Sequence, residues 1–75
     1  MRNVYRVNRN GFTQSFVAKS KQHAAIIAVK HIIPALVYKC NCKTVNGLEV
    51  YEVTADNFYI DVTVTQVNET QGALL

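Results

Sequence analysis

Two carboxylates, Glu52 and Asp61, are the residues of this chain best suited to acid–base chemistry. Paired carboxylates can divide the roles of acid and base when like-charge repulsion separates their pKa values. The strand registers derived below place the two directly opposite each other, on a face that also carries Lys39 and Lys43. Lysines within reach of both acids indicate a solvated charge network. We therefore expect no catalytic residue and no enzymatic activity.

Histidines and cysteines are the other residues that could hold a metal ion. His23 and His31 are eight residues apart in a predicted helix, about 12 Å along its axis, which is too far to share one ion. Cys40 and Cys42 alternate onto one face of a predicted strand, but a tetrahedral site needs further ligands and the chain has no third cysteine. We expect the cysteines to be small core residues and the protein to use no metal or cofactor.

The element that must position these residues is a helix over Ser20–Pro34, SKQHAAIIAVKHIIP. Ser20 can cap its first turn, and Pro34 cannot continue it. Its apolar stripe predicts the face that packs on the sheet: Ala25, Ala28, Val29, Ile32 and Leu36.

Strand patterns flank the helix at 3–8, 12–18, 36–45, 48–55 and 58–67. Asn10-Gly11 and Asn46-Gly47 are strong two-residue hairpin signals, and Asp56-Asn57 forms a third tight turn. These loops set the registers, which pair Tyr5 with Phe16, Cys40 with Val53, Cys42 with Tyr51, Val53 with Ile60 and Glu49 with Val64. In these registers the apolar residues fall on one face, and a one-residue slip would invert that arrangement.

The order β-β-α-β-β-β predicts an α+β fold, with a single helix on one face of a mainly antiparallel five-stranded sheet. A β-grasp-like arrangement, with the first and last strands central and parallel, fits the same pattern. The length of 75 residues allows one domain, which we place at 1–67, with a frayed tail at 68–75.

Three surfaces are candidates for binding. The helix side away from the stripe carries His23, Ile27, Lys30 and His31, and Ile27 could anchor a protein partner. The open sheet face carries Lys39, Lys43, Glu52, Tyr59 and Asp61. A third, basic surface for nucleic acid combines Arg2, Arg6, Arg9, Lys19 and Lys21.

Composition narrows the class of activity. A chain that is 49% hydrophobic and 17% charged can fold, but its core is too small to surround a deep catalytic pocket within one subunit. The net charge of +3 favours acidic partners. The absence of an apolar run near 18 residues and the unpaired cysteine pattern predict a cytoplasmic protein with no membrane partner.

A resemblance adds a specific expectation. The segment YRVNRNGFTQSFVAKSKQHAAIIA, a short hairpin followed by a Ser-capped, alanine-rich helix and further strands, resembles very small phage and mobile-element proteins of the anti-CRISPR type. The resemblance covers most of the chain as architecture and includes no diagnostic motif. It implies a stoichiometric inhibitor that binds a bacterial defence nucleoprotein and blocks its nucleic-acid path.

We therefore expect a small protein-binding module that acts by contact, with a nucleoprotein complex among the possible partners and a homodimer as a possible state. The alternative is a small basic protein that binds nucleic acid through the arginine-rich N-terminal hairpin. Binding of that kind weakens steeply with salt, because each neutralised phosphate releases counterions.

Overall fold

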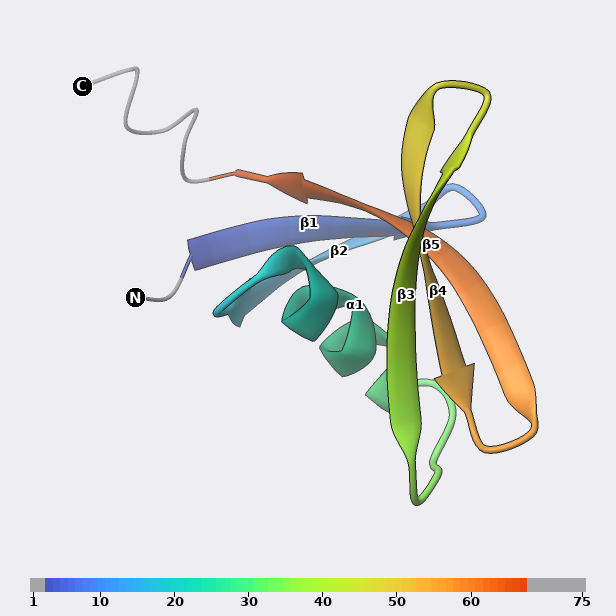
Figure 1. Ribbon diagram of the computed structural model, residues 1–75. Coiled ribbons are helices and arrows are strands. Elements are labelled where there is room, and N and C mark those ends of the chain that lie inside the picture. The colour runs from blue at the N-terminus through green and yellow to red at the C-terminus, as the bar shows by residue number, and fades with distance from the viewer. Residues whose placement is uncertain (1–2, 68–75) are drawn as a thin grey trace.

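The computed structural model describes residues 3–67, in which a helix lies against one face of a strongly twisted sheet (Figure 1). The elements, in chain order, are β1 (Asn3–Arg9), β2 (Phe12–Ala18), α1 (Lys21–Lys30), β3 (Tyr38–Val45), β4 (Leu48–Ala55) and β5 (Phe58–Gln66). This confirms the α+β class and the predicted order. Arg2 and the predicted tail at 68–75 lie outside the described residues.

The five strands form one sheet in the order β2-β1-β5-β4-β3, and every neighbouring pair is antiparallel. The first and last strands, β1 and β5, are neighbours but antiparallel, so the β-grasp alternative is wrong. The edges are β2 and β3, and α1 is the connection between them. The chain therefore crosses one face of the sheet from edge to edge, and no helix within residues 3–67 covers the other face.

The hairpin turns adopt the conformation that their sequences predict. Asn10 and Gly11 have φ of 51° and 82°, and Asn46 and Gly47 have φ of 54° and 79°. Two successive positive φ values are the mark of a type I′ turn, whose twist matches the flanking strands. The predicted registers follow from these turns: Tyr5 lies opposite Phe16, Cys40 opposite Val53, Cys42 opposite Tyr51 and Val53 opposite Ile60.

One predicted strand pair is wrong. Val64 does not lie opposite Glu49; its partner is Val7 of β1. Strand β5 pairs with β4 as far as Val62 and with β1 from Thr63 onward, because the sheet twists along its length. Val64 is consequently buried.

The helix begins as predicted and ends early. The Ser20 hydroxyl accepts a hydrogen bond from the His23 backbone N–H at 3.2 Å. The last helical residue is Lys30, four positions before Pro34. Proline disfavours helical geometry at the residue before it, so the chain leaves the helix before Ile33. The Ile32 N–H donates to the Val29 carbonyl at 2.9 Å, three positions back instead of the four of an α-helix.

The core lies between α1 and the sheet. Small alanines on the helix allow close packing, and the buried residues of this core cluster are Tyr5, Val7, Ala18, Ala24, Ala25, Ala28, Val29, Tyr51, Val53, Ala55, Val62 and Val64. The predicted stripe is confirmed at Ala25, Ala28 and Val29. It is wrong at Ile32 and Leu36, which are 39% and 95% exposed because the helix has already ended.

The two cysteines differ in their surroundings. Cys40 is half-buried against the core, whereas Cys42 is exposed, so the prediction of a core role is wrong for Cys42. Cys42 lies nearer the Asn46-Gly47 turn, where the β3–β4 hairpin extends beyond the helix (Figure 1). The prediction of which sheet face carries Cys42 is correct, but α1 does not cover that face at this end of the hairpin.

Candidate functional site

Four large apolar side chains are exposed near the Asp56-Asn57 turn. Leu36 is 95% exposed, Val37 55%, Phe58 64% and Tyr59 69%. Leu36 and Val37 precede β3, and Phe58 and Tyr59 begin β5, at the lower end of the sheet in Figure 1. We call these four residues the end patch. Consecutive strand residues such as Phe58 and Tyr59 point to opposite faces of the sheet, so these side chains surround one end of the sheet. Exposed apolar side chains gathered at one end of a sheet can serve as a protein-contact surface.

The end patch is held by side-chain hydrogen bonds to the backbone. The Asp56 carboxylate accepts the backbone N–H of Leu36 at 3.2 Å and that of Val37 at 3.3 Å. The Asp56 N–H donates in return to the Val37 carbonyl at 3.2 Å. These bonds join the segment before β3 to the β4–β5 turn.

A tyrosine fixes the same segment on its other side. The Tyr38 hydroxyl donates to the Ile33 carbonyl at 2.6 Å and accepts the Ala35 backbone N–H at 2.8 Å. The segment between α1 and β3 therefore has a defined shape although it forms no regular element. An ordered patch loses less conformational entropy when a partner binds.

The open sheet face continues from the end patch. Lys39, Thr54 and Tyr59 lie side by side across β3, β4 and β5. Lys39 makes no ion pair among residues 3–67. Its free ammonium group lies on the same sheet face as the exposed Tyr59, two strands away, and favours a partner surface that has an acidic rim.

The predicted charge network occupies the next part of this face. Glu52 and Asp61 lie directly opposite each other, and Lys43 Nζ lies 3.4 Å from Glu52 Oε2 and 3.2 Å from Asp61 Oδ2. The hydrogen bond to Asp61 is the main reason that the pKa of Lys43 is raised. The lysine between the two acids makes this an exposed ion-pair network, as the sequence indicates.

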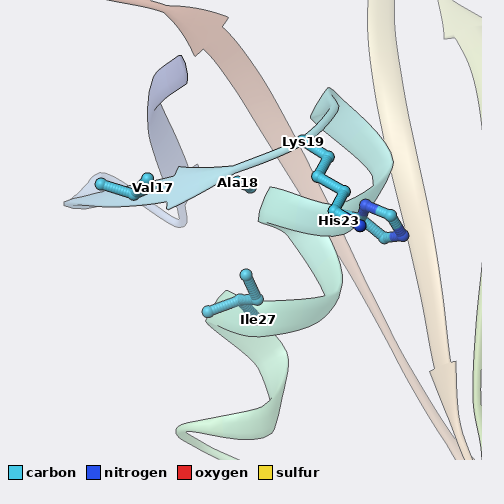
Figure 2. A pocket seen from close by; sticks show the side chains of 5 residues that line it. All are labelled: Val17, Ala18, Lys19, His23 and Ile27. Carbon is cyan, nitrogen blue, oxygen red and sulfur yellow. The ribbon is translucent and has the colours of Figure 1, made fainter. Parts of the chain in front are cut away.

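The four helix residues predicted to bind a partner do not form one surface. His23 and Ile27 line a pocket of about 230 Å³ together with Val17, Ala18 and Lys19 (Figure 2). We call it the helix pocket. Figure 2 shows β2 on one side of it and α1 on the other. The structure thus brings His23 and Ile27 together with the exposed end of β2.

Lys30 and His31 make contacts elsewhere. The His31 ring stacks on Phe16 with a centroid separation of 5.4 Å, and Lys30 Nζ lies 5.4 Å from the centre of the Tyr38 ring. Ile27, placed by the sequence on the helix side away from the predicted stripe, is half-buried and packs against the core. Its size therefore contributes to stability as well as to the pocket.

The basic residues do not gather on one surface. Alternation along β1 turns Arg6 away from the helix side, to which Tyr5 and Val7 point. Arg9 lies over the Phe12 ring at 6.0 Å, and Lys19 lines the helix pocket. Lys21 Nζ lies 3.5 Å from Glu49 Oε1, so an acid offsets its charge. Arg2 lies outside the described residues.

Glu49 connects the helix start to the sheet through two partners. It accepts a hydrogen bond from the Tyr51 hydroxyl at 3.1 Å and pairs with Lys21. The bond from Tyr51 is the main cause of a lowered pKa at Glu49. Burial, followed by the bond to Glu49, raises the pKa of Tyr51. This cluster joins α1 to β4 and leaves Tyr51 un-ionised at neutral pH.

Within residues 3–67 no group of three or more histidine, cysteine, aspartate and glutamate side chains is arranged to hold a metal ion. Burial, with a further contribution from neighbouring Cys42, raises the pKa of the Cys40 thiol. A thiol with a raised pKa is a weaker nucleophile at neutral pH, because less of it is thiolate.

Sequence reasoning missed three members of the end patch. Leu36 was assigned to the helix stripe, and Val37 and Phe58 were given no binding role. The signal that could have corrected Leu36 is Pro34, which disfavours helix at the residue before it. Tyr59 was correctly placed on the open face.

The part of the chain that the structure describes includes no helix long and apolar enough to span a membrane. Comparison of the chain with protein-family models, with curated proteins and with solved structures finds no match.

Proposed function

We propose that this chain is a small protein-binding module that acts by stoichiometric contact, with the end patch as its main binding surface. The observation that carries the proposal is the exposure of Leu36 and Val37 on a segment fixed by Asp56 and Tyr38, next to the exposed side chains that begin β5, Phe58 and Tyr59. Buried aromatic and aliphatic anchors supply most of the energy of protein interfaces. The partner chemistry that fits is an apolar protein surface with an acidic rim, which would face Lys39.

The alternative, nucleic-acid binding through the N-terminal hairpin, has less support. Lys21 is paired with Glu49 and Arg9 lies on Phe12. Arg6 and Lys19 belong to opposite sides of the sheet. Phosphate binding needs several cations that face one way, and the described hairpin and helix start do not offer this.

The narrower form of the proposal is an inhibitor of a bacterial defence nucleoprotein that blocks its nucleic-acid path in the cytoplasm. It is supported by the resemblance to very small anti-CRISPR proteins and by the unbridged thiols of Cys40 and Cys42. The test is expression of the chain in bacteria that carry an active defence nucleoprotein, with restored phage growth as the expected result. Unchanged defence across several such systems would remove the narrower form and leave the protein-binding proposal standing.

The experiment that tests the broader proposal is affinity capture from a host lysate, with and without nuclease. Leu36→Ser removes an exposed leucine of the end patch, and Leu48→Ser is the matched control, because Leu48 is 57% exposed at the opposite end of β4. We expect the wild type and Leu48→Ser to retain the same protein in fixed ratio after nuclease treatment, and Leu36→Ser to lose it. Capture that disappears with nuclease would support the nucleic-acid alternative.

A further inference from the structure

The edge strand β2 lacks the features that keep sheet edges from pairing. Edge strands are commonly protected by charged side chains, proline or bulges. The other edge, β3, carries Lys39 and Lys43, whereas β2, FTQSFVA, has no charged residue and no proline. Its register with β1 runs without interruption from Ala18 to Phe12. Of the two edges, β2 is the one open to another strand.

The hairpin register determines which backbone groups β2 offers. The residues that flank a two-residue I′ loop, Arg9 and Phe12, form a hydrogen-bonded pair, and such pairs then alternate along the ladder. The N–H and C=O groups of Thr13, Ser15 and Val17 therefore point away from β1. In the sheet formed by residues 3–67, β2 has no second neighbour.

We infer that two copies of this chain associate by antiparallel pairing of their β2 strands about a twofold axis at Ser15. In that register Ser15 faces Ser15 of the second copy, and Thr13 faces Val17 of the second copy. All three outward-pointing residues then fall in hydrogen-bonded positions, so the free backbone groups of both strands are satisfied. The pairing joins two five-stranded sheets into one of ten strands.

The same register fills the helix pocket. It places Phe12 of one copy opposite Ala18 of the other, on the helix side of the sheet. Phe12 is 57% exposed, and Ala18 lines the pocket with His23 and Ile27 (Figure 2). The Phe12 ring of each copy thus enters the helix pocket of the other copy. A twofold axis makes this contact occur twice in each dimer.

Charge at this contact gives the association a characteristic salt response. Lys19 lines the pocket, and Arg9 lies over the Phe12 ring that would enter it. Two copies therefore bring cations near one another, and added salt screens their repulsion. The dimer should tighten with salt, whereas nucleic-acid binding weakens with salt.

Self-association goes beyond the proposed function, because β2 and the end patch are different surfaces. A dimer would present two end patches on one rigid sheet. Bivalent presentation raises the effective affinity for a partner that offers two copies of its binding site.

The test is sedimentation equilibrium of the full chain over a wide range of concentrations. The wild type should pass from monomer to dimer, and Phe12→Ala should weaken the dimer at least about tenfold, because it removes the ring that each pocket buries. Leu36→Ser should leave the equilibrium unchanged. A wild type that stays monomeric at every concentration overturns the inference, without affecting the protein-binding proposal.

A charge exchange tests the register itself. One variant carries Thr13→Glu with Val17→Glu, and the other carries Thr13→Lys with Val17→Lys; both positions are exposed, and circular dichroism checks that each variant folds. Each variant alone should be monomeric, because like charges face each other, and the mixture should form a heterodimer. Dimers of either single variant, or a mixture that stays monomeric beside a dimeric wild type, would contradict pairing through β2 in this register.

Discussion

Asp56 and Val37 exchange two hydrogen bonds: the Val37 N–H donates to the Asp56 carboxylate at 3.3 Å, and the Asp56 N–H donates to the Val37 carbonyl at 3.2 Å. One residue of a tight turn thereby fixes a segment that lies nineteen positions earlier in the chain, directly before β3. The end patch depends on this connection, since Leu36 and Val37 have no regular structure of their own.

Asp56→Gly should measure what the hydrogen bonds of the Asp56 carboxylate contribute to stability while the turn is kept. Glycine accepts the positive φ of 53° at this position, so the turn is kept and only the carboxylate is lost. We expect the free energy of unfolding to fall by about 1–2 kcal/mol, because two backbone donors lose their acceptor. Urea denaturation checks this. Asp56→Asn, which keeps one acceptor oxygen, is the control and should lose less; equal losses in the two variants would contradict the account.

Lys43→Met should expose the repulsion between Glu52 and Asp61. Those carboxylates lie directly opposite each other, and Lys43 contacts both. We expect a lower melting temperature at neutral pH, a smaller deficit in high salt, and recovery in the double variant with Asp61→Asn. A deficit that is independent of salt would point to lost packing instead.

Tyr51 should ionise late. Its pKa is raised in the folded state by burial and by Glu49, so its contribution to stability is complete below the unfolded pKa of about 10 and is lost as pH rises above that value. The difference between tyrosinate titrations of wild type and Tyr51→Phe should lie above pH ~10 in the folded protein. In the protein unfolded by urea, the midpoint of the same difference should lie at about pH 10. A folded-state difference centred at or below that value would contradict the hydrogen-bonded, buried position.

Gly47→Ala should test the I′ turn without any packing change. A Cβ added at Gly47 would meet nothing within 4 Å, but φ there is 79°. Left-handed geometry costs an L-residue roughly 1–2 kcal/mol, and we expect that loss in thermal or urea unfolding. Gly47→Asn should lose less, because asparagine tolerates this region. Equal stability of the alanine variant and the wild type would show that the turn changes shape at little cost.

The strand registers were predictable because turn chemistry and alternation agree. Asn10-Gly11, Asn46-Gly47 and Asp56-Asn57 each fix a loop length, and the apolar residues then fall on one face. The join between β1 and β5 was not predictable, because no short turn links these strands and the pairing depends on the twist of the sheet.

The candidate site was only partly predictable. Tyr59 and Lys39 follow from strand alternation, and the structure places them side by side with Thr54. Leu36 was misplaced because apolar periodicity continues past the point at which the helix ends. The conformation of this segment depends on the hydrogen bond from the Leu36 N–H to the distant Asp56 carboxylate and on the local bond from the Tyr38 hydroxyl, and apolar periodicity encodes neither.

The most direct test of the central claim is calorimetric titration of the captured partner with three proteins: wild type, Tyr59→Ala and Leu48→Ser. Binding through the end patch predicts one partner for each chain, an affinity at least about tenfold weaker for Tyr59→Ala, and no change for Leu48→Ser. Equal affinity of Tyr59→Ala, Leu36→Ser and the wild type would contradict the assignment of the binding surface.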